Sequence, residues 1–396
     1  MKSKNILFLT PRFPYPLIGG DKIKSYNLLK YLSKHHNVTL VSFNIDHSTT
    51  KEHIAAIEEL GVKVIDVPLN VKVGVFRTAG RLLTTAPLEV DFFTQPQFKK
   101  VVDDLLDNCD IDLAISFFMR TSGYLKNKSI PTILIAEDCR TLYMKRSYKE
   151  SFNIFQKSVR YWEYRKLRNF EPKLMGNFDI VTFVTKEDIE YAKKQNPKPE
   201  YRLLTNGTDL TKFYPAENNK ERKFILLTGK MDIWANHIMA KYIVKKIMPE
   251  VVKEVPNAKL MIVGANPTLD VRLLQSQYVE VTGNVPDLLP YLQKARVFLH
   301  PHSGATGIQN KLLEAMAAGC PVVTSNTGNQ GIYAKHLQAA LIANSTEEFV
   351  KYTIQLLKDD DLVEKLSKNC RKLIEETHSW EVVNEQMRGI IEELCD

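Results

Sequence analysis

The stretch from Leu299 to Ser325 reads L-H-P-H-S-G-A-T-G-I-Q-N-K-L-L-E-A-M-A-A-G-C-P-V-V-T-S, the pattern of a strand end, a loop, a helix, a tight turn and a second strand. Thr306 and Gln309 have the spacing of a capping box, which predicts a helix that begins at Thr306 or just after it. Gly319 has the place of a C′ glycine that ends this helix. Residues 322–324, Val-Val-Thr, are typical of a buried strand.

A polar group occupies the front of this predicted helix. Asn310, Lys311 and Glu314 lie within about one helical turn, beside the positive end of the helix dipole. An anion placed there would meet backbone N–H groups and a lysine ammonium together, and a carboxylate one turn on suits sugar hydroxyls. The pattern favours a nucleotide diphosphate site. The alternative is a surface helix with solvated charges, but the apolar residues 315–318 indicate that the rest of the helix is buried.

Composition places the chain among globular proteins. Its 396 residues favour two domains, and 44% hydrophobic and 25% charged residues are globular values. No apolar run approaches the ~18–20 residues that span a bilayer, and residues 4–11 read as a first strand rather than a signal peptide. Five scattered cysteines without metal-ligand spacing argue against a disulfide framework. We therefore expect a cytoplasmic protein.

The net charge of +8 is unevenly spread, because residues 201–396 carry 23 basic and 23 acidic side chains. Residues 140–173 alone hold ten basic and three acidic side chains, interleaved with aromatic residues. Residues 75–108 combine basic side chains with apolar ones that we expect to be exposed, namely Val75, Phe76, Leu82, Leu83, Phe92 and Phe93. Both segments are typical of contact with an anionic membrane surface. The plainer alternative for residues 141–175 is a long domain-spanning helix with snorkelling charges; nucleic acid is a third, and we expect no such partner.

The first half opens with a strand from Lys4 to Pro11, a loop, a helix from about Ile23 and a strand from Asn37 to Asn44. This β–loop–α–β order predicts a doubly wound sheet. Ligands of such sheets bind beyond the carboxyl ends of the strands, where Gly19 and Gly20 let the backbone approach closely. Such a pair also occurs in ordinary turns.

Further strands are expected at Val62–Leu69, Ile111–Phe118, Pro131–Ala136, Asp179–Val184 and Tyr201–Leu204. Glu137 and Asp138 follow the third of these strands directly. Two carboxylates at the end of a strand are well placed for a binding site, but they suit a cap of the following helix equally.

The second half repeats the same order of elements after a polar, loop-like segment at 215–222. The expected elements are strands at Lys223–Thr228, Lys259–Gly264, Val279–Gly283, Val297–His300 and Ile332–Ile342, and helices at Asn236–Met248, Asp287–Gln293, within 346–376, and from about Trp380 to the end of the chain. Alternating units of this length predict a second doubly wound sheet.

Five segments together resemble the GT-B glycosyltransferases, and most closely glycosyltransferase family 4, whose members retain configuration and use nucleotide sugars. They are Pro14–Leu29, Asn206–Asp209, Leu260–Gly264, Val281–Val285 and Gly307–Val323. The last segment, with G-I-Q-N-K, is similar to the exopolysaccharide sugar transferases. The resemblance implies an α/β GT-B fold of two Rossmann-like, doubly wound domains that face each other across a cleft. It implies an acceptor-side domain at 1–205, a nucleotide-sugar domain at 206–376, and a helix at 377–396 that packs back on the first domain.

The resemblance also implies roles for individual residues. Glu314 matches the glutamate that binds the ribose hydroxyls, whereas Thr306 stands where a glutamate usually contacts the donor sugar. Members of the family usually carry a pair of basic residues in the second domain. Lys230 stands in place of the first, an arginine, and the second aligns near Asn236, so Lys311 is the candidate to restore the missing positive charge. The implied donor-binding residues are Gly19, Gly20, Val285, Thr306, Gly307, Ile308, Gln309, Asn310 and Glu314, and the implied catalytic residues are Glu137, Asp138, Lys230 and Lys311.

The function implied by the resemblance is sugar transfer from a nucleotide diphosphate donor, UDP- or GDP-linked, with retention. The acceptor would be a glycan or a polyprenyl-linked sugar in cell-surface polysaccharide synthesis, at the inner face of the membrane. We expect no metal and no cofactor beyond the nucleotide sugar, because basic side chains neutralise the leaving group. Two rivals remain: a GT-B nucleotide-sugar 2-epimerase, and a non-catalytic GT-B protein that binds a glycan or scaffolds an assembly. The missing first glutamate, and a missing histidine beside Asp138, are the reasons to keep the second rival open.

Overall fold

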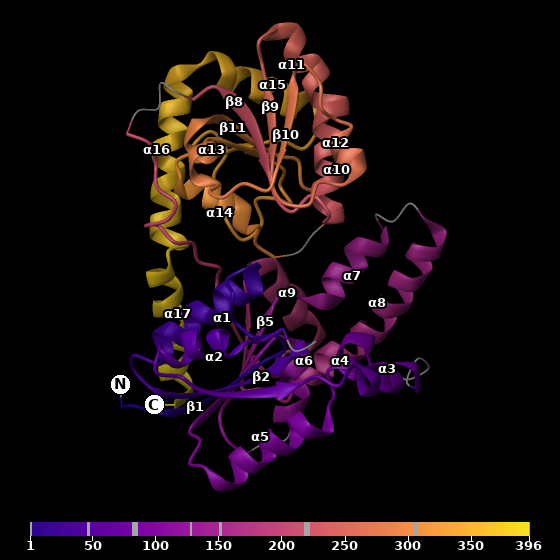
Figure 1. Ribbon diagram of the computed structural model, residues 1–396, viewed down its shortest axis with the longest axis vertical. Helices are drawn as coiled ribbons and strands as arrows, with labels where there is room; N and C mark the ends of the chain where they lie inside the picture. The colour runs from indigo at the N-terminus through magenta and orange to yellow at the C-terminus, as the bar shows by residue number, and fades with distance from the viewer. Residues whose placement is uncertain are drawn as a thin grey trace. The chain divides into compact units, whose positions relative to one another are not determined.

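A computed structural model describes residues 2–45, 48–80, 86–126, 129–149, 153–217, 222–304 and 307–395. Its contacts divide the chain into two compact units. The first unit comprises Met1–Thr205 with Val383–Asp396, and the second comprises Asn206–Val382 (Figure 1). Each unit is built around one parallel sheet with helices packed on it, which is the mixed α/β architecture expected from the sequence.

In the first unit, the described residues form a sheet of seven parallel strands in the order β3-β2-β1-β4-β5-β6-β7. The strands are β1 (Asn5–Thr10), β2 (Asn37–Asn44), β3 (Lys63–Pro68), β4 (Leu113–Phe117), β5 (Thr132–Glu137), β6 (Ile180–Phe183) and β7 (Glu200–Leu203). The helices are α1 (Gly20–Leu32), α2 (Lys51–Glu58), α3 (Val71–Gly80), α4 (Leu88–Phe92), α5 (Pro96–Asn108), α6 (Met119–Ser122), the 3₁₀ turn η2 (Gly123–Leu125), α7 (Arg140–Lys149), α8 (Ile154–Met175) and α9 (Lys186–Gln195).

The core of the first unit corrects one expectation about exposed aromatic residues. Phe93 is buried rather than exposed, and Phe92 is partly buried. The Phe93 ring packs edge-on against Phe43, which in turn stacks on Phe98 with ring centroids 4.1 Å apart. Apolar side chains between Phe92 and Leu106 therefore pack in the core of the sheet. Among the described residues of 75–108, the large exposed apolar side chains are those of Val75 and Phe76. Leu82 and Leu83 lie outside the described residues.

The second unit has a sheet of six parallel strands among its described residues, in the order β10-β9-β8-β11-β12-β13. The strands are β8 (Phe224–Thr228), β9 (Leu260–Val263), β10 (Val279–Gly283), β11 (Ala295–His300), β12 (Val322–Thr324) and β13 (Leu341–Ile342). The helices are α10 (Trp234–Tyr242), the π turn η4 (Ile243–Ile247), α11 (Met248–Glu254), α12 (Leu269–Arg272), α13 (Leu289–Lys294), α14 (Asn310–Ala317), α15 (Thr346–Lys358) and α16 (Asp360–Thr377).

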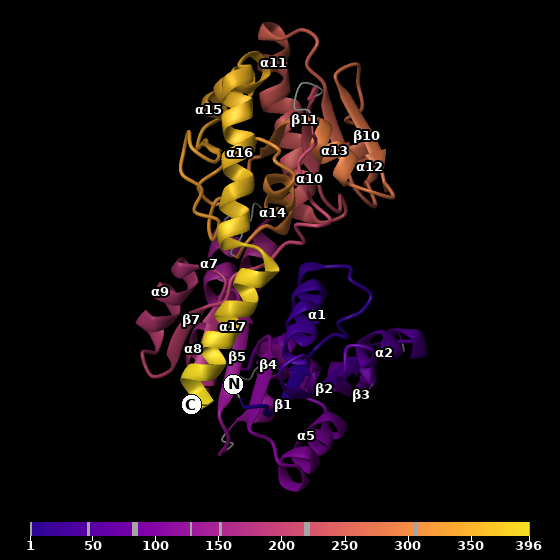
Figure 2. The ribbon, with the colours of Figure 1, turned by 90° about the vertical axis from the view of Figure 1, so that its left-hand side faces the viewer.

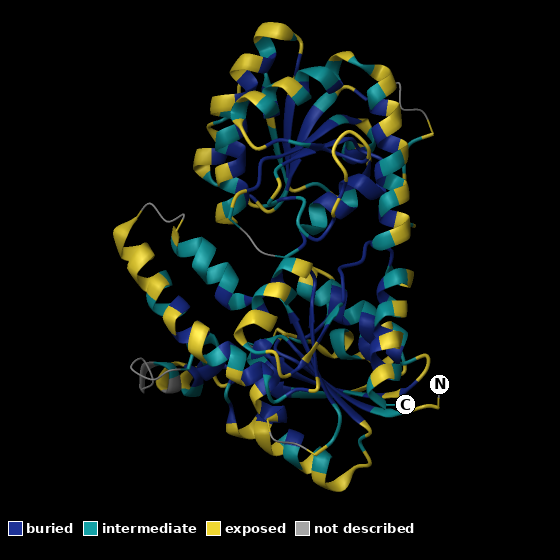
Figure 3. Ribbon diagram, turned by 180° about the vertical axis from the view of Figure 1, so that it is seen from behind, coloured by how far each residue is buried: buried dark blue, intermediate teal, exposed yellow. Residues whose placement is uncertain are grey.

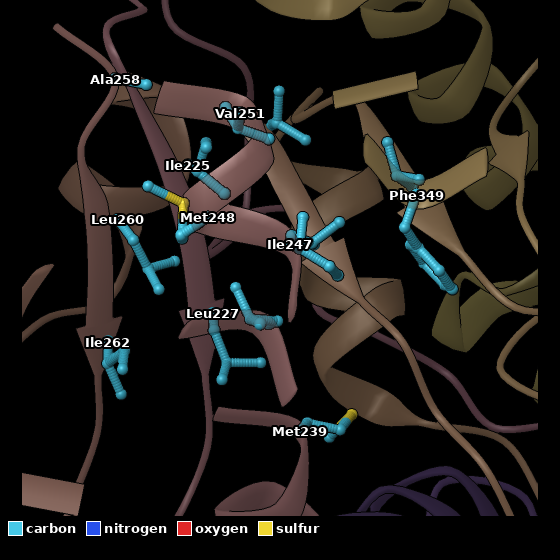
Figure 4. Close-up of a cluster of buried hydrophobic side chains, with 14 of the residues drawn as sticks. Ile225, Leu227, Met239, Ile247, Met248, Val251, Ala258, Leu260, Ile262 and Phe349 are labelled. Atoms are coloured by element: carbon cyan, nitrogen blue, oxygen red, sulfur yellow. The ribbon is translucent and has the colours of Figure 1, made fainter. Parts of the chain in front are cut away.

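The core of the second unit lies between the sheet and its covering helices. Side chains of β8 and β9 meet those of η4, α11 and α15 in one apolar cluster, which includes Ile225, Leu227, Leu260, Ile262, Ile247, Val251 and Phe349 (Figure 4). These strands are buried on both faces, and continuous apolar runs are typical of parallel strands for that reason. The cluster holds the carboxyl ends of the strands, and the loops that follow them, in fixed positions.

Two boundaries in the second unit differ from the sequence prediction. Helix α14 begins at Asn310 and not at Thr306, because Gly307 has a positive φ of 77° and Gln309 is extended. Thr306 itself lies outside the described residues. The predicted strand at Ile332–Ile342 is reduced to Leu341–Ile342, and Tyr333 and Leu337 instead adopt positive φ in a looped segment.

The predicted end of helix α14 is confirmed in detail. Gly319 has a φ of 63°, and its N–H donates to the carbonyl of Met316 at 3.0 Å. The N–H of Cys320 donates to the carbonyl of Ala315 at 2.9 Å. These two bonds form a Schellman motif, in which glycine adopts the left-handed conformation without steric cost.

Helices α7 (Arg140–Lys149) and α8 (Ile154–Met175) form a helix pair, one of the two forms, a long helix or a helix pair, that the sequence predicts for this segment. Helices α7 and α8 pack against each other and stand away from the sheet (Figures 1 and 3). Tyr148 of α7 lies against Tyr161 and Tyr164 of α8, with centroid separations of 5.3 and 5.5 Å. Much of the aromatic content of this segment therefore joins the two helices to each other. Ile154 and Phe155, at the start of α8, remain 78% and 74% exposed.

The last helix, α17 (Trp380–Cys395), belongs from Val383 onward to the first unit. Thr205 donates its backbone N–H to Gln386, and Arg202 pairs with Glu393. Lys4 Nζ donates to the carbonyl of Cys395 at 3.2 Å, so the two chain ends lie near each other (Figure 2). No helix among the described residues is long and apolar enough to cross a membrane.

Candidate functional site

Glycines occur at the carboxyl ends of three neighbouring strands in the second unit. Gly229 follows β8, Gly264 follows β9 and Gly283 ends β10, and all three have positive φ. A Cβ atom on Gly264 would lie 1.9 Å from the carbonyl oxygen of Gly229. The two backbones therefore touch at the carboxyl edge of the sheet, the edge at which open α/β sheets bind their ligands.

Lys311 is anchored at this edge by Asn236. The side-chain carbonyl of Asn236 accepts a hydrogen bond from Lys311 Nζ, and its Nδ2 donates to the backbone carbonyl of Lys230 at 2.8 Å. Asn236 is buried, so it fixes the ammonium group relative to the loop after β8. Burial lowers the pKa of Lys311 to about 8, although the nearby Glu314 carboxylate acts in the opposite direction. A partly desolvated ammonium of this kind gains strongly from an anionic ligand.

Glu314 lies one turn further along α14. Burial raises the pKa of its carboxyl to about 7, against the opposing charges of Lys212 and Lys311. The charges of Lys311 and Glu314 act on each other, but burial has the larger effect on the pKa of each group. Paired perturbations of this kind are typical of binding and catalytic sites.

The rest of the α14 amino end carries the other predicted donor residues. Gln309 occupies the N-cap position without a side-chain cap, Ile308 is buried, and Gly307 turns the chain into the helix. Asn310 accepts a hydrogen bond from Nδ2 of Asn206 at 2.9 Å. The predicted segment at 206–209 is thereby brought to the front of α14.

Two buried histidines, which the sequence interpretation did not assign to the site, lie at the end of β11 and just after it. His300 and His302 are 0% and 4% exposed, and their rings stack with centroids 5.1 Å apart. His300 Nδ1 lies 3.2 Å from Thr324 Oγ1, but His300 Nε2 and both nitrogens of His302 have no hydrogen-bond partner. The H-P-H pattern is visible in the sequence, but nothing in it signals that both rings are enclosed.

Lys230 and Val285 have fewer described contacts with Lys311, Asn236 and Glu314. The Lys230 side chain is exposed and lies 3.6 Å from Asp232, so its backbone carbonyl, not its ammonium, links it to Asn236 and Lys311. Val285 is half-buried, two residues after Gly283. Both remain predicted ligand contacts at the same edge of the sheet.

In the first unit, Glu137 is paired with a lysine that the sequence interpretation missed. The Lys24 Nζ atom lies 2.6 Å from Glu137 Oε1 and donates to the carbonyl of Leu204 at 2.8 Å. Lys24 is almost fully buried, and burial raises the pKa of Glu137 despite this lysine. Glu137 has a positive φ of 68°, which is a strained conformation for this residue. The two partners are 113 positions apart, which is why no local pattern revealed the pair.

A second charged group lies beside it at the ends of β4 and β5. Glu89 accepts from Arg120 Nε at 3.1 Å and from Arg140 Nε at 3.2 Å, and Arg140 also lies 3.5 Å from Asp138. Arg120 packs over the ring of Phe118, whose φ is 64°. A cavity of about 30 Å³ is lined by Glu89, Phe118, Met119, Arg120 and Arg140.

Glu171, and not Glu137 or Asp138, caps the start of α7. The backbone N–H groups of Arg140 and Thr141, at the start of α7, donate to the Glu171 carboxylate at 2.9 and 2.8 Å. Glu171 is buried, and its burial raises the pKa of its carboxyl. The cap of α7 therefore comes from α8.

Gly19 and Gly20 lie at the front of α1 in the first unit. Gly19 is the N-cap with a φ of 107°, and Gly20 is the first helical residue, so α1 begins about three residues earlier than predicted. Both glycines are exposed. Within the described residues, no cluster of three or more histidine, cysteine or acidic side chains has a geometry that would hold a metal ion.

Comparison with known proteins finds a family model that matches part of the second unit. Residues 222–359 match the family described as glycosyl transferases group 1. An uncharacterized 44.6 kDa protein in the cps region of Klebsiella pneumoniae is 23% identical over 389 residues, covering 94% of this chain and 96% of that protein.

Solved structures agree on the fold. Sucrose-phosphate synthase from Thermosynechococcus elongatus superposes with a TM-score of 0.72 at 17% identity, covering 99% of both chains. Anabaena HepE in complex with UDP-glucose superposes with a TM-score of 0.65 at 14% identity, covering 99% of this chain and all of that one. The chain thus has the GT-B fold, and its residues 222–359 form a glycosyl transferases group 1 domain.

Proposed function

We propose that this protein is a glycosyltransferase that moves a sugar from a nucleotide diphosphate donor to a glycan or lipid-linked acceptor, with retention at the anomeric carbon. The observation that carries the proposal is the juxtaposition of Lys311 and Glu314 on one turn at the amino end of α14. One offers a desolvated positive charge and the other a carboxylate with a perturbed pKa. A diphosphate and a ribose present the complementary groups.

The roles within the second unit follow from charge. Lys311 and the amino end of α14 meet the diphosphate, and Glu314 accepts hydrogen bonds from the ribose hydroxyls. As the anomeric C–O bond to the diphosphate breaks, negative charge grows on the leaving oxygen, and a fixed cation stabilises that charge more than it stabilises the ground state. A new bond forms from the anomeric carbon to the acceptor oxygen, and the acceptor proton passes to the leaving phosphate. Neutralisation by basic side chains is the proposed alternative to a metal ion.

The first unit is proposed to bind the acceptor. Glu137, held by Lys24, and the group of Arg120, Glu89 and Arg140 lie at the carboxyl ends of β4 and β5. Carboxylates and guanidinium groups beside aromatic rings suit the hydroxyls and faces of a sugar. Gly19 and Gly20 keep their proposed role as backbone donors to the diphosphate.

A lipid-linked acceptor is supported by the surface of α8 and α3. Ile154, Phe155 and Phe76 are each more than 70% exposed, and the helix pair carries most of the excess positive charge of the chain. Apolar side chains within a basic surface suit the headgroup region of an anionic membrane. The relative from a cps region fits an acceptor in cell-surface polysaccharide synthesis.

The experiment that tests the proposal is a thermal-shift panel of UDP, GDP, ADP and TDP, because selective binding raises the apparent stability of the folded protein. We expect one nucleotide, UDP first and GDP second, to stabilise the protein well above the others. The corresponding nucleotide sugars are then incubated with and without acceptor glycans. Release of nucleotide with a new glycosidic product supports a transferase, an epimerised sugar nucleotide supports an epimerase, and binding without turnover across the panel supports the non-catalytic rival.

A further inference from the structure

The stacked pair of His300 and His302 presents three enclosed polar atoms without partners. They are His300 Nε2, His302 Nδ1 and His302 Nε2. Buried polar atoms in folded proteins are almost always hydrogen-bonded, and exceptions call for an explanation such as a bound water or ligand. Three such exceptions on two adjacent rings therefore call for an explanation.

Thr324 determines the tautomer of His300. Its hydroxyl donates to the backbone carbonyl of His300 at 3.0 Å, which uses its single hydrogen. The contact at 3.2 Å between Thr324 Oγ1 and His300 Nδ1 therefore requires Nδ1 to be the donor. Burial and the nearby charge of Lys311 hold the pKa of His300 well below its usual value, so the ring is neutral. His300 Nε2 is left as a bare lone pair that needs a donor.

His302 contributes one donor and one acceptor. Burial lowers its pKa to about 4, so this ring is also neutral at ordinary pH and carries one N–H and one lone pair. The two rings lie nearly parallel, with an interplanar angle of 17°. A stacked arrangement directs ring nitrogens away from each other's edges, so the pair does not satisfy itself.

The hydrogen-bonding groups of the two rings, taken together, indicate which class of ligand they suit. The atoms of the two rings without partners comprise two lone pairs and one N–H. A phosphate offers acceptors and would leave both lone pairs unsatisfied next to negative charge. A hydroxyl donates and accepts at once, and neighbouring hydroxyls on a ring match two acceptors and one donor.

The position of the pair places it beside the diphosphate site. His300 ends β11 and His302 begins the loop that leads into α14, and the charge of Lys311 is close enough to lower the pKa of both rings. Gly328 closes one side, since a Cβ there would lie 2.9 Å from His300 Nδ1 and 2.3 Å from Thr324 Oγ1. The backbone thus packs directly on the His300 ring and holds its orientation.

We propose that His300 and His302 form a hydroxyl-binding site for the transferred sugar of the donor, with His302 as the residue that selects among sugars. This inference rests on the proposed function, because the nucleotide and diphosphate must bind at α14 for the sugar to reach the pair. His302 then supplies a sugar contact at the carboxyl edge of the sheet that does not depend on Thr306.

The test compares nucleotides with their sugars in two variants of the full chain. His302→Phe keeps a ring but removes the donor and the acceptor, and His302→Gln keeps one of each. Isothermal titration measures the dissociation constants of UDP, UDP-glucose, UDP-galactose and UDP-N-acetylglucosamine, and of GDP and GDP-mannose. We expect His302→Phe to bind the free nucleotide within twofold of wild type, but to lose about tenfold of its preference for the best nucleotide sugar. His302→Gln should recover part of that preference.

Each outcome has a distinct meaning. An unchanged preference in His302→Phe, with the nucleotide still bound, would show that the pair holds only an internal water and would overturn this inference alone. Failure of every nucleotide to bind the wild-type protein would overturn the proposed function and this inference with it. If His302→Phe unfolds, His302→Gln decides, because replacing the imidazole by an amide moves the donor and the acceptor and should still change the ranking of sugars. In ¹⁵N spectra, the imidazole nitrogens of His302 should shift with the nucleotide sugar and not with the nucleotide.

Discussion

The buried charge of Lys311 favours binding of an anionic ligand but costs stability in the free protein. Its ammonium is desolvated, and a lowered pKa means that the protein holds the charged form at a cost at neutral pH. We expect Lys311→Met to reduce turnover and nucleotide affinity by about 30- to 150-fold, because a charge-assisted contact is worth about 2–3 kcal/mol. The same variant should change the thermal midpoint by only a few degrees, because removal of a buried charge is offset by loss of the hydrogen bond to Asn236.

The control for this variant is Lys246→Ala, an exposed lysine of the same unit. It should leave both turnover and midpoint unchanged. Steady-state kinetics and differential scanning fluorimetry on the same samples suffice. Retained turnover in Lys311→Met would remove the residue from the proposed mechanism.

Glu314 and Lys311 together predict a bell-shaped dependence of donor affinity on pH. The carboxyl titrates with a pKa of about 7 and the ammonium with a pKa of about 8. Below the first value Glu314 is neutral and accepts hydroxyls poorly, and above the second Lys311 loses its charge. Affinity for UDP-glucose, whose phosphates do not titrate between pH 5 and 9, should therefore peak between these values. Titration calorimetry at several pH values should show Glu314→Gln without the acid limb but with the alkaline one; an acid limb that persists would assign it to another group.

At the scale of elements, α14 is held from its carboxyl end. The buried guanidinium of Arg222 donates to the carbonyls of Ala295 and Gly319, each at 2.7 Å, and to those of Leu292 and Ala318 at longer distance. These bonds tie the end of α14 to α13 and β11. The distance between the binding residues of α14 and the loops of the sheet edge is thereby fixed.

We expect Arg222→Ala to destabilise the second unit by about 3 kcal/mol, because it strands four buried carbonyls and leaves a cavity. Arg222→Lys should recover only part, since an ammonium cannot reproduce the fork of donors. Urea unfolding followed by intrinsic fluorescence measures the loss. The neighbouring Lys223→Ala, an exposed position, serves as control, and equal stability of all three variants would contradict the anchoring role.

The start of α8 carries a prediction about membranes. Wild-type protein should co-sediment with phosphatidylglycerol vesicles at low salt and be released as salt screens the charge. Replacing Ile154 and Phe155 by serine should lower binding several-fold. Leu269, the first residue of α12, and Leu273, its C-cap, are 71% and 73% exposed and offer a matched apolar pair in the second unit. If their replacement by serine weakens binding equally, the surface of α8 is not the membrane contact.

Elements were predictable where one physical signal dominates. Buried parallel strands give continuous apolar runs, and Gly319 gives an unambiguous helix end, so both sheets follow from the sequence. The predicted start of α14 at Thr306 was wrong. The capping-box spacing of Thr306 and Gln309 and the turn at Gly307 indicate different first residues for the helix, and only the backbone dihedral angles distinguish them. The burial of Phe93 depends on Phe43, fifty positions earlier, which no local pattern reports.

The candidate site divides in the same way. Lys311 and Glu314 are close in sequence, so helical spacing alone brought them together. Lys24 and Glu137, or Lys311 and Asn236, meet through the tertiary fold, and spacing carries no information about such pairs. Enclosure of His300 and His302 is likewise a property of the packed structure.

At the scale of the whole molecule, the chain returns to its first unit at the end. Val383, Met387 and Ile391 on α17 are fully buried. Because this helix is separate in sequence from the rest of the unit, its removal or loosening should affect the first unit while the fold of the second unit persists. The chain is therefore expected to lose stability in two parts rather than in one cooperative step.

Ile391→Ala and Leu356→Ala form a reciprocal pair that tests this expectation. Both side chains are fully buried, one in α17 and the other in α15 of the second unit, and each truncation should cost about 2–5 kcal/mol. Hydrogen exchange followed by mass spectrometry should show faster exchange in β6 and β7 for Ile391→Ala, and in β8 and β9 for Leu356→Ala. Nucleotide-induced protection of α14 should survive the first change and weaken in the second. Faster exchange throughout both units from either change would instead mean that the chain unfolds as one cooperative body, because local openings would then be coupled across the whole protein.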